Sequence, residues 1–187
     1  MINKEHKCIF VHIPKTGGTS IIKALDMKRT THKTAKELKE EYDEWDDFFS
    51  FSIVRNPWDR MVSIYFHFKR VNEKPIIKKK VDIPSTFSDF IYEFNEKKIK
   101  FNTILYQQQA DWIYDDNQNL LVNQIYKFEN YSDEVEKIFK KLGIKKKLTH
   151  ERRTIHEHYS TYYAEETINI VKNLFEKDII LFGYEYE

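Results

Sequence analysis

The segment that most limits what this chain can fold into is a glycine-containing loop between an apolar run and a helical pattern. The apolar run predicts a buried strand over about residues 7–13. The loop, residues 14–20, reads Pro-Lys-Thr-Gly-Gly-Thr-Ser and holds half of the chain's 4 glycines. Apolar side chains then recur at helical spacing at Ile21, Ile22 and Leu25. The order strand, loop, helix is typical of an α/β protein.

This loop has the composition of an anion-binding turn. Glycines let a backbone approach a ligand closely, and the free N–H groups at the start of a helix point toward that ligand. A nucleoside triphosphatase places its loop lysine after the last glycine, directly before the Ser or Thr that holds magnesium. Lys15 instead precedes both glycines. The sequence therefore predicts an anion site that departs from the ATP and magnesium pattern; a plain tight turn at Gly17 and Gly18 is the alternative.

A second cluster begins where another predicted strand, residues 48–54, passes into a helix. Asn56 is a favourable N-cap and Pro57 suits the first helical position. The apolar spacing that follows predicts a helix to about Arg70. A second polar cluster thus follows the carboxyl end of a second strand.

Arg55 and Ser63 are the candidate phosphate ligands of this second cluster. A guanidinium forks onto phosphate oxygens. Ser63, two turns into the helix, would donate its hydroxyl to the same group if that helix packs beside the first loop. An ion pair between Arg55 and Asp59 is the alternative. Two anion sites after two strands, one without a magnesium motif, indicate a nucleotide with phosphates at both ends of its ribose.

The rest of the chain continues the alternation of strands and helices. Its 187 residues suit one compact domain. Alternating strands and helices favour an α/β fold with a parallel sheet flanked by helices. The further predicted elements are a helix at 35–41 with a capping box of Thr34 and Glu37, a helix at 86–98, a strand at 122–128, a helix at 133–142 capped by Ser132 and ended by Gly143, a helix at 163–176, and a last turn capped by Asp178 before Gly183.

Charge and cysteine content exclude several classes of protein. Lys and Arg number 31 against 30 Asp and Glu, a formal net charge of +1. This balance excludes a generally basic nucleic-acid-binding surface, so any anion must be held by a local cluster. The single cysteine, Cys8, allows no internal disulfide and is expected to be an inert buried thiol. The chain shows no signal-peptide pattern and no apolar run of membrane length, so we expect a cytoplasmic protein without nucleic-acid or membrane partners.

The two clusters resemble motifs of a known family. Residues 12–20, HIPKTGGTS, look like the 5′-phosphosulfate loop of the PAPS-dependent sulfotransferases, and residues 54–63, VRNPWDRMVS, look like their 3′-phosphate motif. The likeness points to small bacterial members of the carbohydrate sulfotransferase group that includes heparan sulfate 2-O-sulfotransferase. It extends through residues 32–35, 126–129 and 178–184. It implies a P-loop, nucleotide-kinase-like fold, one sulfotransferase domain over residues 1–187, PAPS as sulfuryl donor, PAP as product, and no metal.

The resemblance also implies roles for individual residues. Lys15 would contact the 5′-phosphosulfate and its bridging oxygen, while Arg55 and Ser63 would hold the 3′-phosphate. The cytosolic sulfotransferases add a glycine-rich basic loop near the C-terminus for that phosphate, which this sequence lacks; Arg152 and Arg153 lie in roughly that region. The residues that would cradle the 5′-phosphosulfate with Lys15 are Thr16, Gly17, Gly18, Thr19 and Ser20.

Sulfuryl transfer needs an acceptor hydroxyl in line with the breaking S–O bond, a base for its proton, and positive charge on the leaving phosphate. Lys15 is the expected electrostatic catalyst. His32 is the hypothesis for the base, because imidazole titrates near neutral pH and related enzymes place a His or Glu after the first helix. A solvated loop residue is its alternative reading. His67, His156 and His158 are the other histidines considered for the base, and His12 is expected to orient the loop.

The acceptor is expected to be a carbohydrate hydroxyl. The segment 72–84 reads as an exposed loop or lid, and the triple-lysine runs at 78–80 and 145–147 read as solvated faces that would alternatively guide an anionic glycan. Two other functions stay open from the sequence. One is a non-catalytic PAP-binding or glycan-binding module. The other is a kinase-like phosphotransferase, which would require magnesium and ATP. The oligomeric state is not predicted.

Overall fold

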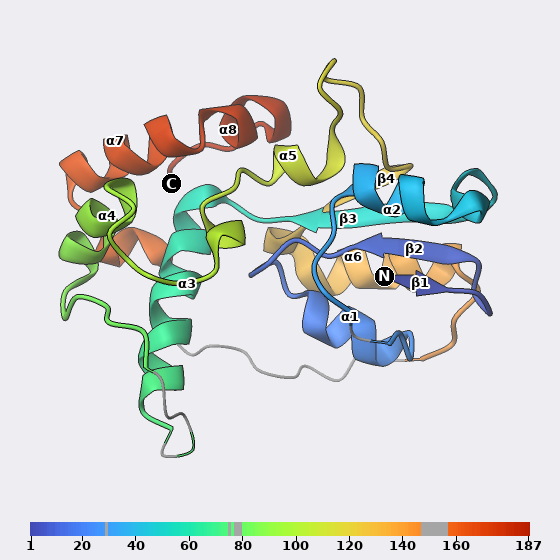
Figure 1. Ribbon diagram of the computed structural model, residues 1–187, viewed down its shortest axis with the longest axis horizontal. Coiled ribbons are helices and arrows are strands. Elements are labelled where there is room, and N and C mark those ends of the chain that lie inside the picture. The colour runs from blue at the N-terminus through green and yellow to red at the C-terminus, as the bar shows by residue number, and fades with distance from the viewer. Residues whose placement is uncertain (29, 75, 77–79, 147–156) are drawn as a thin grey trace. The chain divides into compact units, whose positions relative to one another are not determined.

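The chain forms two units, each built from two separate stretches of sequence. A computed structural model describes residues 1–28, 30–74, 76, 80–146 and 157–187. Unit 1 comprises Met1–Arg55 and Gln109–Arg152, and unit 2 comprises Asn56–Gln108 and Arg153–Glu187. Figure 1 shows the elements of both units. Arg152, Arg153, His156 and parts of both triple-lysine runs, about which the sequence makes predictions, lie outside the described residues.

Unit 1 contains a four-stranded mixed sheet in the order β1-β2-β3-β4. Its strands are β1 (Ile2–Asn3), β2 (Cys8–Val11), β3 (Phe49–Val54) and β4 (Gln124–Lys127). The pairs β2–β3 and β3–β4 are parallel, so the three strands predicted from the sequence and their parallel pairing are confirmed. The two-residue strand β1 pairs antiparallel with β2. It was not predicted, because two residues are too short to carry a periodic pattern.

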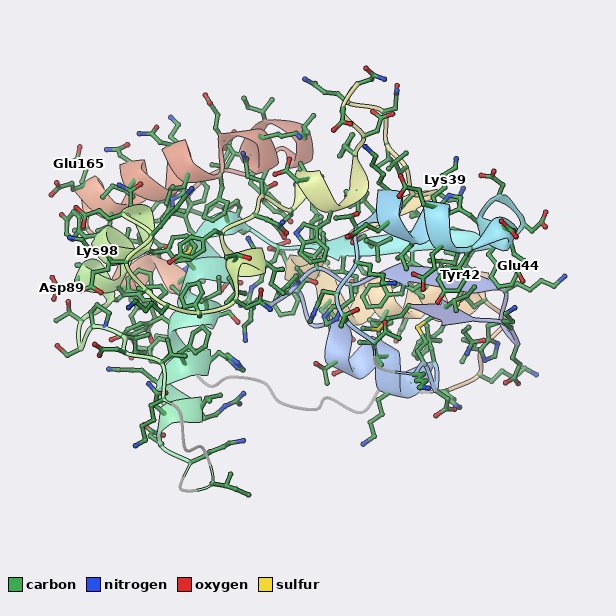
Figure 2. All side chains as sticks on the ribbon, in the orientation of Figure 1. Lys39, Tyr42, Glu44, Asp89, Lys98 and Glu165 are labelled. Atoms are coloured by element: carbon green, nitrogen blue, oxygen red, sulfur yellow. The ribbon has the colours of Figure 1, made fainter. Side chains whose placement is uncertain are left out.

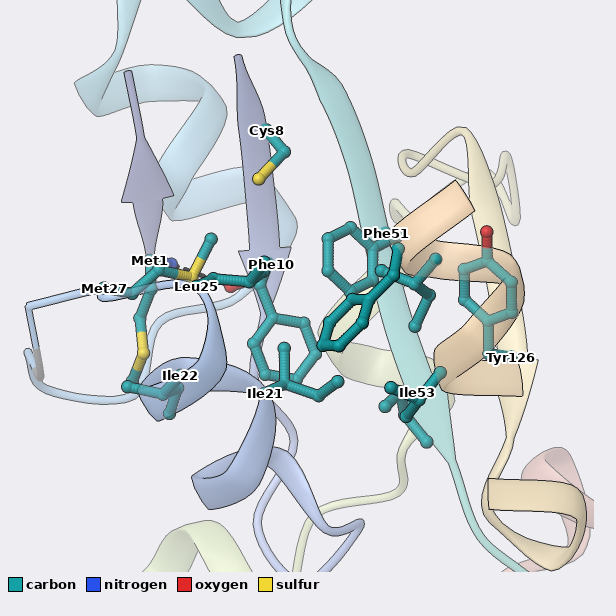
Figure 3. Packing of buried hydrophobic residues seen from close by; sticks show 13 residues of the cluster. Met1, Cys8, Phe10, Ile21, Ile22, Leu25, Met27, Phe51, Ile53 and Tyr126 are labelled. Carbon is teal, nitrogen blue, oxygen red and sulfur yellow. Dashed lines mark hydrogen bonds between the residues drawn. The ribbon is translucent and has the colours of Figure 1, made fainter. Parts of the chain in front are cut away.

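One hydrophobic cluster joins the sheet of unit 1 to two helices, α1 (Gly18–Ala24) and α6 (Tyr131–Lys141). Phe10 and Phe51 stack with ring centroids 5.0 Å apart at the centre of the cluster (Figure 3). Helix α1 contributes Ile21 and Ile22. Burial of these side chains provides most of the driving force for folding this unit, and it fixes the position of the loop between β2 and α1.

Several predicted helix boundaries in unit 1 are confirmed. Helix α2 (Ala35–Glu41) starts with the predicted capping box, in which the Thr34 hydroxyl accepts from the Glu37 N–H and the Glu37 carboxylate accepts from the Thr34 N–H. The unit also contains η1 (Asp43–Asp47), α5 (Ala110–Ile113) and η3 (Phe128–Asn130). Gly143 ends α6 with φ of 68°, as predicted.

The predicted start of α6 was wrong. The helix begins at Tyr131 with Asn130 as N-cap, whereas the sequence favoured Ser132 as the cap. The reason is that the turn of η3 leads directly into α6, so Ser132 lies inside the helical stretch. The Tyr131 hydroxyl donates a hydrogen bond to the Gly17 carbonyl oxygen at 2.7 Å, a contact between residues 114 positions apart that local rules do not describe.

Unit 2 is built from helices. Helix α3 (Pro57–Asn72) has the predicted cap, with the Asn56 side-chain oxygen accepting from the Trp58 N–H at 3.0 Å and Pro57 at the first position. Helix α4 (Phe87–Asn95) is capped by Thr86, which the sequence placed inside the helix. The other elements are η2 (Thr103–Leu105), η4 (Tyr159–Tyr162), α7 (Glu165–Leu174) and α8 (Glu176–Phe182).

The predicted cap at Asp178 was wrong. Asp178 lies inside α8 and is fully buried, and Phe175 occupies the N-cap position. A carboxylate read as a capping group on the surface is therefore an interior group of unit 2. Gly183 ends α8 in the left-handed conformation with φ of 60°, as the sequence indicated.

Charged side chains cover the outer surfaces of both units, as Lys39, Glu44, Lys98 and Glu165 illustrate (Figure 2). Most of the ion pairs are exposed; the side chains of Lys39 and Lys98 are 48% and 64% exposed, for example. Exposed pairs contribute little to stability. The near-neutral charge of the chain thus reflects mixed surfaces rather than an absence of charge.

Candidate active site

The loop between β2 and α1 has a strained, well-defined backbone. Lys15 has φ of 74° and Gly17 has φ of 80°, so two residues within three positions adopt the left-handed region. That region costs a residue with a Cβ about 1–2 kcal/mol, so Lys15 is held there by its surroundings. The Thr16 hydroxyl is fully buried and donates to the Ile13 carbonyl oxygen at 2.9 Å. The loop is therefore shaped before any ligand arrives.

Both glycines are also closely packed. A Cβ on Gly18 would lie 2.1 Å from Cδ2 of the buried His12 ring. A Cβ on Gly17 would lie 2.7 Å from Cε2 of Tyr131 and 2.9 Å from Cε2 of Phe128. Glycine is therefore needed at both positions for close packing as well as for the turn, because aromatic rings lie directly against each Cα.

Tyr131 contacts the loop through its hydroxyl. This group donates to the Gly17 carbonyl oxygen at 2.7 Å and is also hydrogen-bonded to the side chain of Ser20. Burial raises the pKa of Tyr131 to about 12, so the phenol stays protonated at physiological pH. Ser20, itself 7% exposed, donates its N–H to the same Gly17 oxygen at 3.3 Å.

The structure brings Arg55 to this loop within unit 1. Its Nη1 donates to the Lys15 carbonyl oxygen at 3.2 Å, and its guanidinium carbon lies 4.1 Å from the centroid of the Phe128 ring. A cation at this distance from an aromatic face is attracted by it. Arg55 is only 6% exposed. Two cationic residues of the two sequence clusters, Lys15 and Arg55, therefore belong to one cluster of contacts.

A glutamine holds the backbone of Arg55. The Arg55 N–H donates to Oε1 of Gln109 at 2.8 Å, and Nε2 of Gln109 donates to the Arg55 carbonyl oxygen at 2.7 Å. Gln109 is fully buried. These two bonds satisfy the backbone groups of the residue that follows β3, where the sheet no longer does so.

Three contact residues were missed by the sequence analysis: Gln109, Phe128 and Tyr131. Gln109 ends a run of three glutamines, and nothing in that run marks which side chain is buried. Phe128 is the last residue of the third predicted strand, residues 122–128, and Tyr131 lies three positions beyond it. Their place at the carboxyl end of that strand is the signal that could have found them. Side chains that follow neighbouring parallel strands share one edge of the sheet.

The predicted base, His32, lies in the same unit. It is half-buried, and its ring centroid is 4.8 Å from that of His12 and 6.1 Å from that of Trp112. Since His12 packs against Gly18, the two histidines extend the contacts of the loop toward the start of α2. The other described histidines considered for the base, His67 and His158, belong to unit 2.

Ser63 occupies the second turn of α3 in unit 2 and is 5% exposed. Arg60, from the same motif, is 1% exposed and donates from Nη1 to the Gln107 carbonyl oxygen at 3.2 Å. Residues 54–63 therefore belong to both units: Arg55 follows β3 in unit 1, whereas Arg60 and Ser63 are buried residues of α3 in unit 2.

Comparison with known proteins identifies the family of this chain. The sequence model of the sulfotransferase family matches residues 1–185. The chain belongs to the sulfotransferase family. The sulfotransferase also resembles an uncharacterized protein of Archaeoglobus fulgidus, with 25% identity over 104 residues that cover 56% of this chain and 75% of that protein.

A solved structure shows that this sulfotransferase has the fold of its family. The crystal structure of mouse sulfotransferase SULT7A1 complexed with PAP is similar with a TM-score of 0.56 and 16% identity, covering 93% of this chain and 84% of that chain. A sulfotransferase from Alicyclobacillus acidocaldarius gives a TM-score of 0.45 and 16% identity, over 81% of this chain and 60% of that one. The similarity to the mouse enzyme confirms the P-loop-like α/β fold expected from the sequence.

The described residues contain neither a metal-binding group nor a membrane-spanning helix. No group of three or more His, Cys, Asp or Glu side chains among them is placed to hold a metal ion. In the same part of the sulfotransferase, no helix combines the length and apolar character needed to cross a membrane.

Proposed function

We propose that this sulfotransferase transfers the sulfuryl group of PAPS to a hydroxyl of a carbohydrate and releases PAP. The observation that carries the proposal is the cluster in unit 1 that joins Arg55 to the backbone of Lys15 at 3.2 Å beside a packed glycine loop. Cationic side chains and backbone N–H groups are the donors that phosphate and sulfate groups require. The PAP complex of the similar mouse enzyme supports the choice of nucleotide.

Lys15 is proposed as the electrostatic catalyst and as a ligand of the 5′-phosphosulfate. Negative charge develops on the leaving phosphate as the S–O bond breaks, and a cation placed there stabilises the transition state more than the ground state. Gly17, Gly18, Thr19 and Ser20 are proposed to cradle the same group. Thr16 would act through its backbone, because its buried hydroxyl already donates to the Ile13 carbonyl.

Arg55 and Ser63 are proposed as ligands of the 3′-phosphate. A guanidinium has five N–H donors, so its bond to the Lys15 carbonyl leaves capacity for a phosphate. For Ser63 the proposal rests on its position in the motif. We further propose that residues 1–187 act as one sulfotransferase domain, which the family match through both units supports. The cytoplasmic setting, the metal-free reaction and the carbohydrate class of the acceptor stay predictions from the sequence.

His32 is proposed as the general base. It would accept the proton of the acceptor hydroxyl while the acceptor oxygen forms a bond to sulfur and the bond from sulfur to the phosphate oxygen of PAP breaks. The ring contact of His32 with His12, which packs against Gly18, supports this role. Transfer by positioned groups of this kind needs no redox partner.

Calorimetry with PAP and a transfer assay with labelled PAPS test the donor assignment. PAP should bind in the presence of EDTA, and Lys15→Ala should lower turnover by about 10²–10³, the effect of removing one transition-state donor. The matched control is Lys140→Ala, which removes the same charge from an exposed position on α6 and should leave turnover unchanged. Binding of ATP with magnesium but not of PAP would refute the donor assignment.

The base is tested separately. His32→Ala should keep the affinity for PAP and lower transfer by about 10²–10⁴, the usual contribution of a general base. His67→Ala is the comparison from unit 2. Retained transfer in His32→Ala would assign the base to another residue, and PAP binding by the unmodified protein without transfer to any acceptor in a carbohydrate screen would indicate a binding module.

A further inference from the structure

The segment that follows β4 contacts both donor-binding clusters of unit 1. The Phe128 ring lies 4.1 Å from the Arg55 guanidinium carbon and has its centroid 5.3 Å from that of Tyr131. Tyr131 in turn donates to the Gly17 carbonyl oxygen at 2.7 Å. Neither aromatic residue belongs to the two motifs by which the site was predicted. The segment therefore contacts the site without belonging to either motif.

The bond from Tyr131 acts on a single peptide unit. In a trans peptide the C=O and the N–H point in opposite directions, so fixing the Gly17 oxygen fixes the direction of the Gly18 N–H. The peptide between Gly17 and Gly18 is flanked by two glycines, which tolerate both signs of φ. It is thus the peptide of this loop with the least steric resistance to turning over.

Two further hydrogen bonds support the orientation of the Gly17–Gly18 peptide. The Gly17 oxygen also accepts the Ser20 N–H at 3.3 Å. Since the single O–H of Tyr131 is directed at Gly17, the hydroxyl of Ser20 must be the donor in the hydrogen bond between these two side chains. A protonated phenol is needed for this arrangement, and its burial maintains that state.

We propose that Tyr131 is a positioning residue of the donor site, which holds the Gly17–Gly18 peptide in one orientation and so presents the Gly18 N–H to the anionic group of the donor. The inference rests on the proposed function, because it takes PAPS and PAP as the ligands of the loop. It predicts that the hydroxyl of Tyr131 affects donor binding more than it affects the chemical step.

The test compares Tyr131→Phe with Tyr126→Phe, which removes a hydroxyl from a buried tyrosine of the same unit. Loss of one hydrogen bond corresponds to about a fivefold effect. In Tyr131→Phe the PAP affinity should fall about fivefold and the KM for PAPS should rise similarly, with kcat at saturating PAPS retained. Tyr126→Phe should leave all three unchanged. An unaltered PAP affinity in Tyr131→Phe, or an equal loss in both variants, would overturn the proposal.

A second measurement separates this inference from the proposed function. Relaxation dispersion of the Gly18 backbone ¹⁵N, recorded without ligand, should show microsecond-to-millisecond exchange in Tyr131→Phe and none in the unmodified protein or Tyr126→Phe. If the unmodified protein fails to bind PAP, the donor assignment falls, and these spectra still decide whether Tyr131 holds the peptide. An identical Gly18 profile in all three proteins would refute the hold.

Discussion

Gly17 meets two separate requirements. Its φ of 80° lies in the left-handed region, and a Cβ there would lie 2.7 Å from the Tyr131 ring and 2.9 Å from the Phe128 ring. Gly143 meets only the first requirement, with φ of 68° and no atom within 4 Å of a built Cβ. Comparing Gly17 with Gly143 therefore distinguishes the cost of backbone strain from the cost of steric overlap.

Alanine at each glycine measures these two effects. Gly143→Ala should cost about 1 kcal/mol of unfolding free energy from strain alone. Gly17→Ala should cost about 1–3 kcal/mol more, because the methyl group overpacks two rings. Urea unfolding curves of both variants give the comparison. Equal losses would show that the Tyr131 and Phe128 rings move aside without cost and that the packing around Gly17 does not oppose a methyl group.

Cys8 gives the fold a dependence on alkaline pH. Burial raises the pKa of the Cys8 thiol from 9.0 to about 12. Because the folded state binds this proton more tightly than the unfolded state, the thiol's contribution to stability is complete below pH 9 and is lost as the pH rises from 9 through about 12. Between pH 8 and 10.5, the unfolding free energy should fall more steeply in the unmodified protein than in Cys8→Ala. Tyrosines titrate in both proteins, so parallel curves would contradict the prediction.

At the scale of single elements, local signals predicted most of the structure. The capping box at Thr34 and Glu37 and the Asn56–Pro57 helix start are decided by residues within four positions of each other, and both are confirmed. The failures concern residues whose contacts or burial local rules do not describe. Tyr131, the first residue of α6, bonds to Gly17, and Asp178 is fully buried. Periodicity and capping rules contain no term for such contacts.

The same distinction holds for the candidate site. Lys15 and Arg55 could be singled out because each follows a predicted strand within a short motif. Gln109 could not, since its bonds to Arg55 join residues 54 positions apart. Its role also depends on its complete burial, which its neighbouring glutamines in the sequence do not indicate.

Gln109 joins the end of β3 to the start of α5. Its replacement should lower both the unfolding free energy and the affinity for PAP. Gln109→Leu would leave the Arg55 N–H and C=O without their side-chain partners, and each buried unsatisfied group costs about 1–3 kcal/mol. We expect a loss of at least about 2 kcal/mol in urea unfolding and weaker PAP binding. Gln124→Leu, the same change at an exposed position in β4, is the control. A Gln109→Leu protein as stable as that control would contradict the prediction, because it would show that water replaces the two hydrogen bonds from Gln109 to the Arg55 backbone.

At the scale of the whole molecule, a net charge of only +1 must be reconciled with a multiply anionic ligand. The structure offers a local solution, because Arg55 donates to the backbone of Lys15 and rests on the Phe128 ring in unit 1. Exposed ion pairs elsewhere neutralise one another. The proposed site thus needs only a few local cations at the carboxyl ends of β2 and β3, while the chain as a whole stays near neutrality.

Binding of PAP at the proposed site would stabilise the folded state of unit 1, and the reactivity of Cys8 measures that stabilisation. The thiol is fully buried in the core of unit 1 and is the chain's single cysteine, so a thiol reagent reaches it only when that core opens. A ligand present at 100 times its Kd stabilises the folded state by about 2.7 kcal/mol. When opening is fast relative to labelling, PAP should therefore slow the reaction of Cys8 about 100-fold.

Two variants decide whether the slowing comes from the proposed site. Lys15→Ala should lose most of it at the same PAP concentration, and Lys140→Ala should retain it, although both remove one positive charge. Magnesium should change neither result. If calorimetry detects PAP binding while the labelling rate of Cys8 stays the same with and without PAP, the nucleotide binds without stabilising the core of unit 1, and the loop between β2 and α1 is not its principal contact.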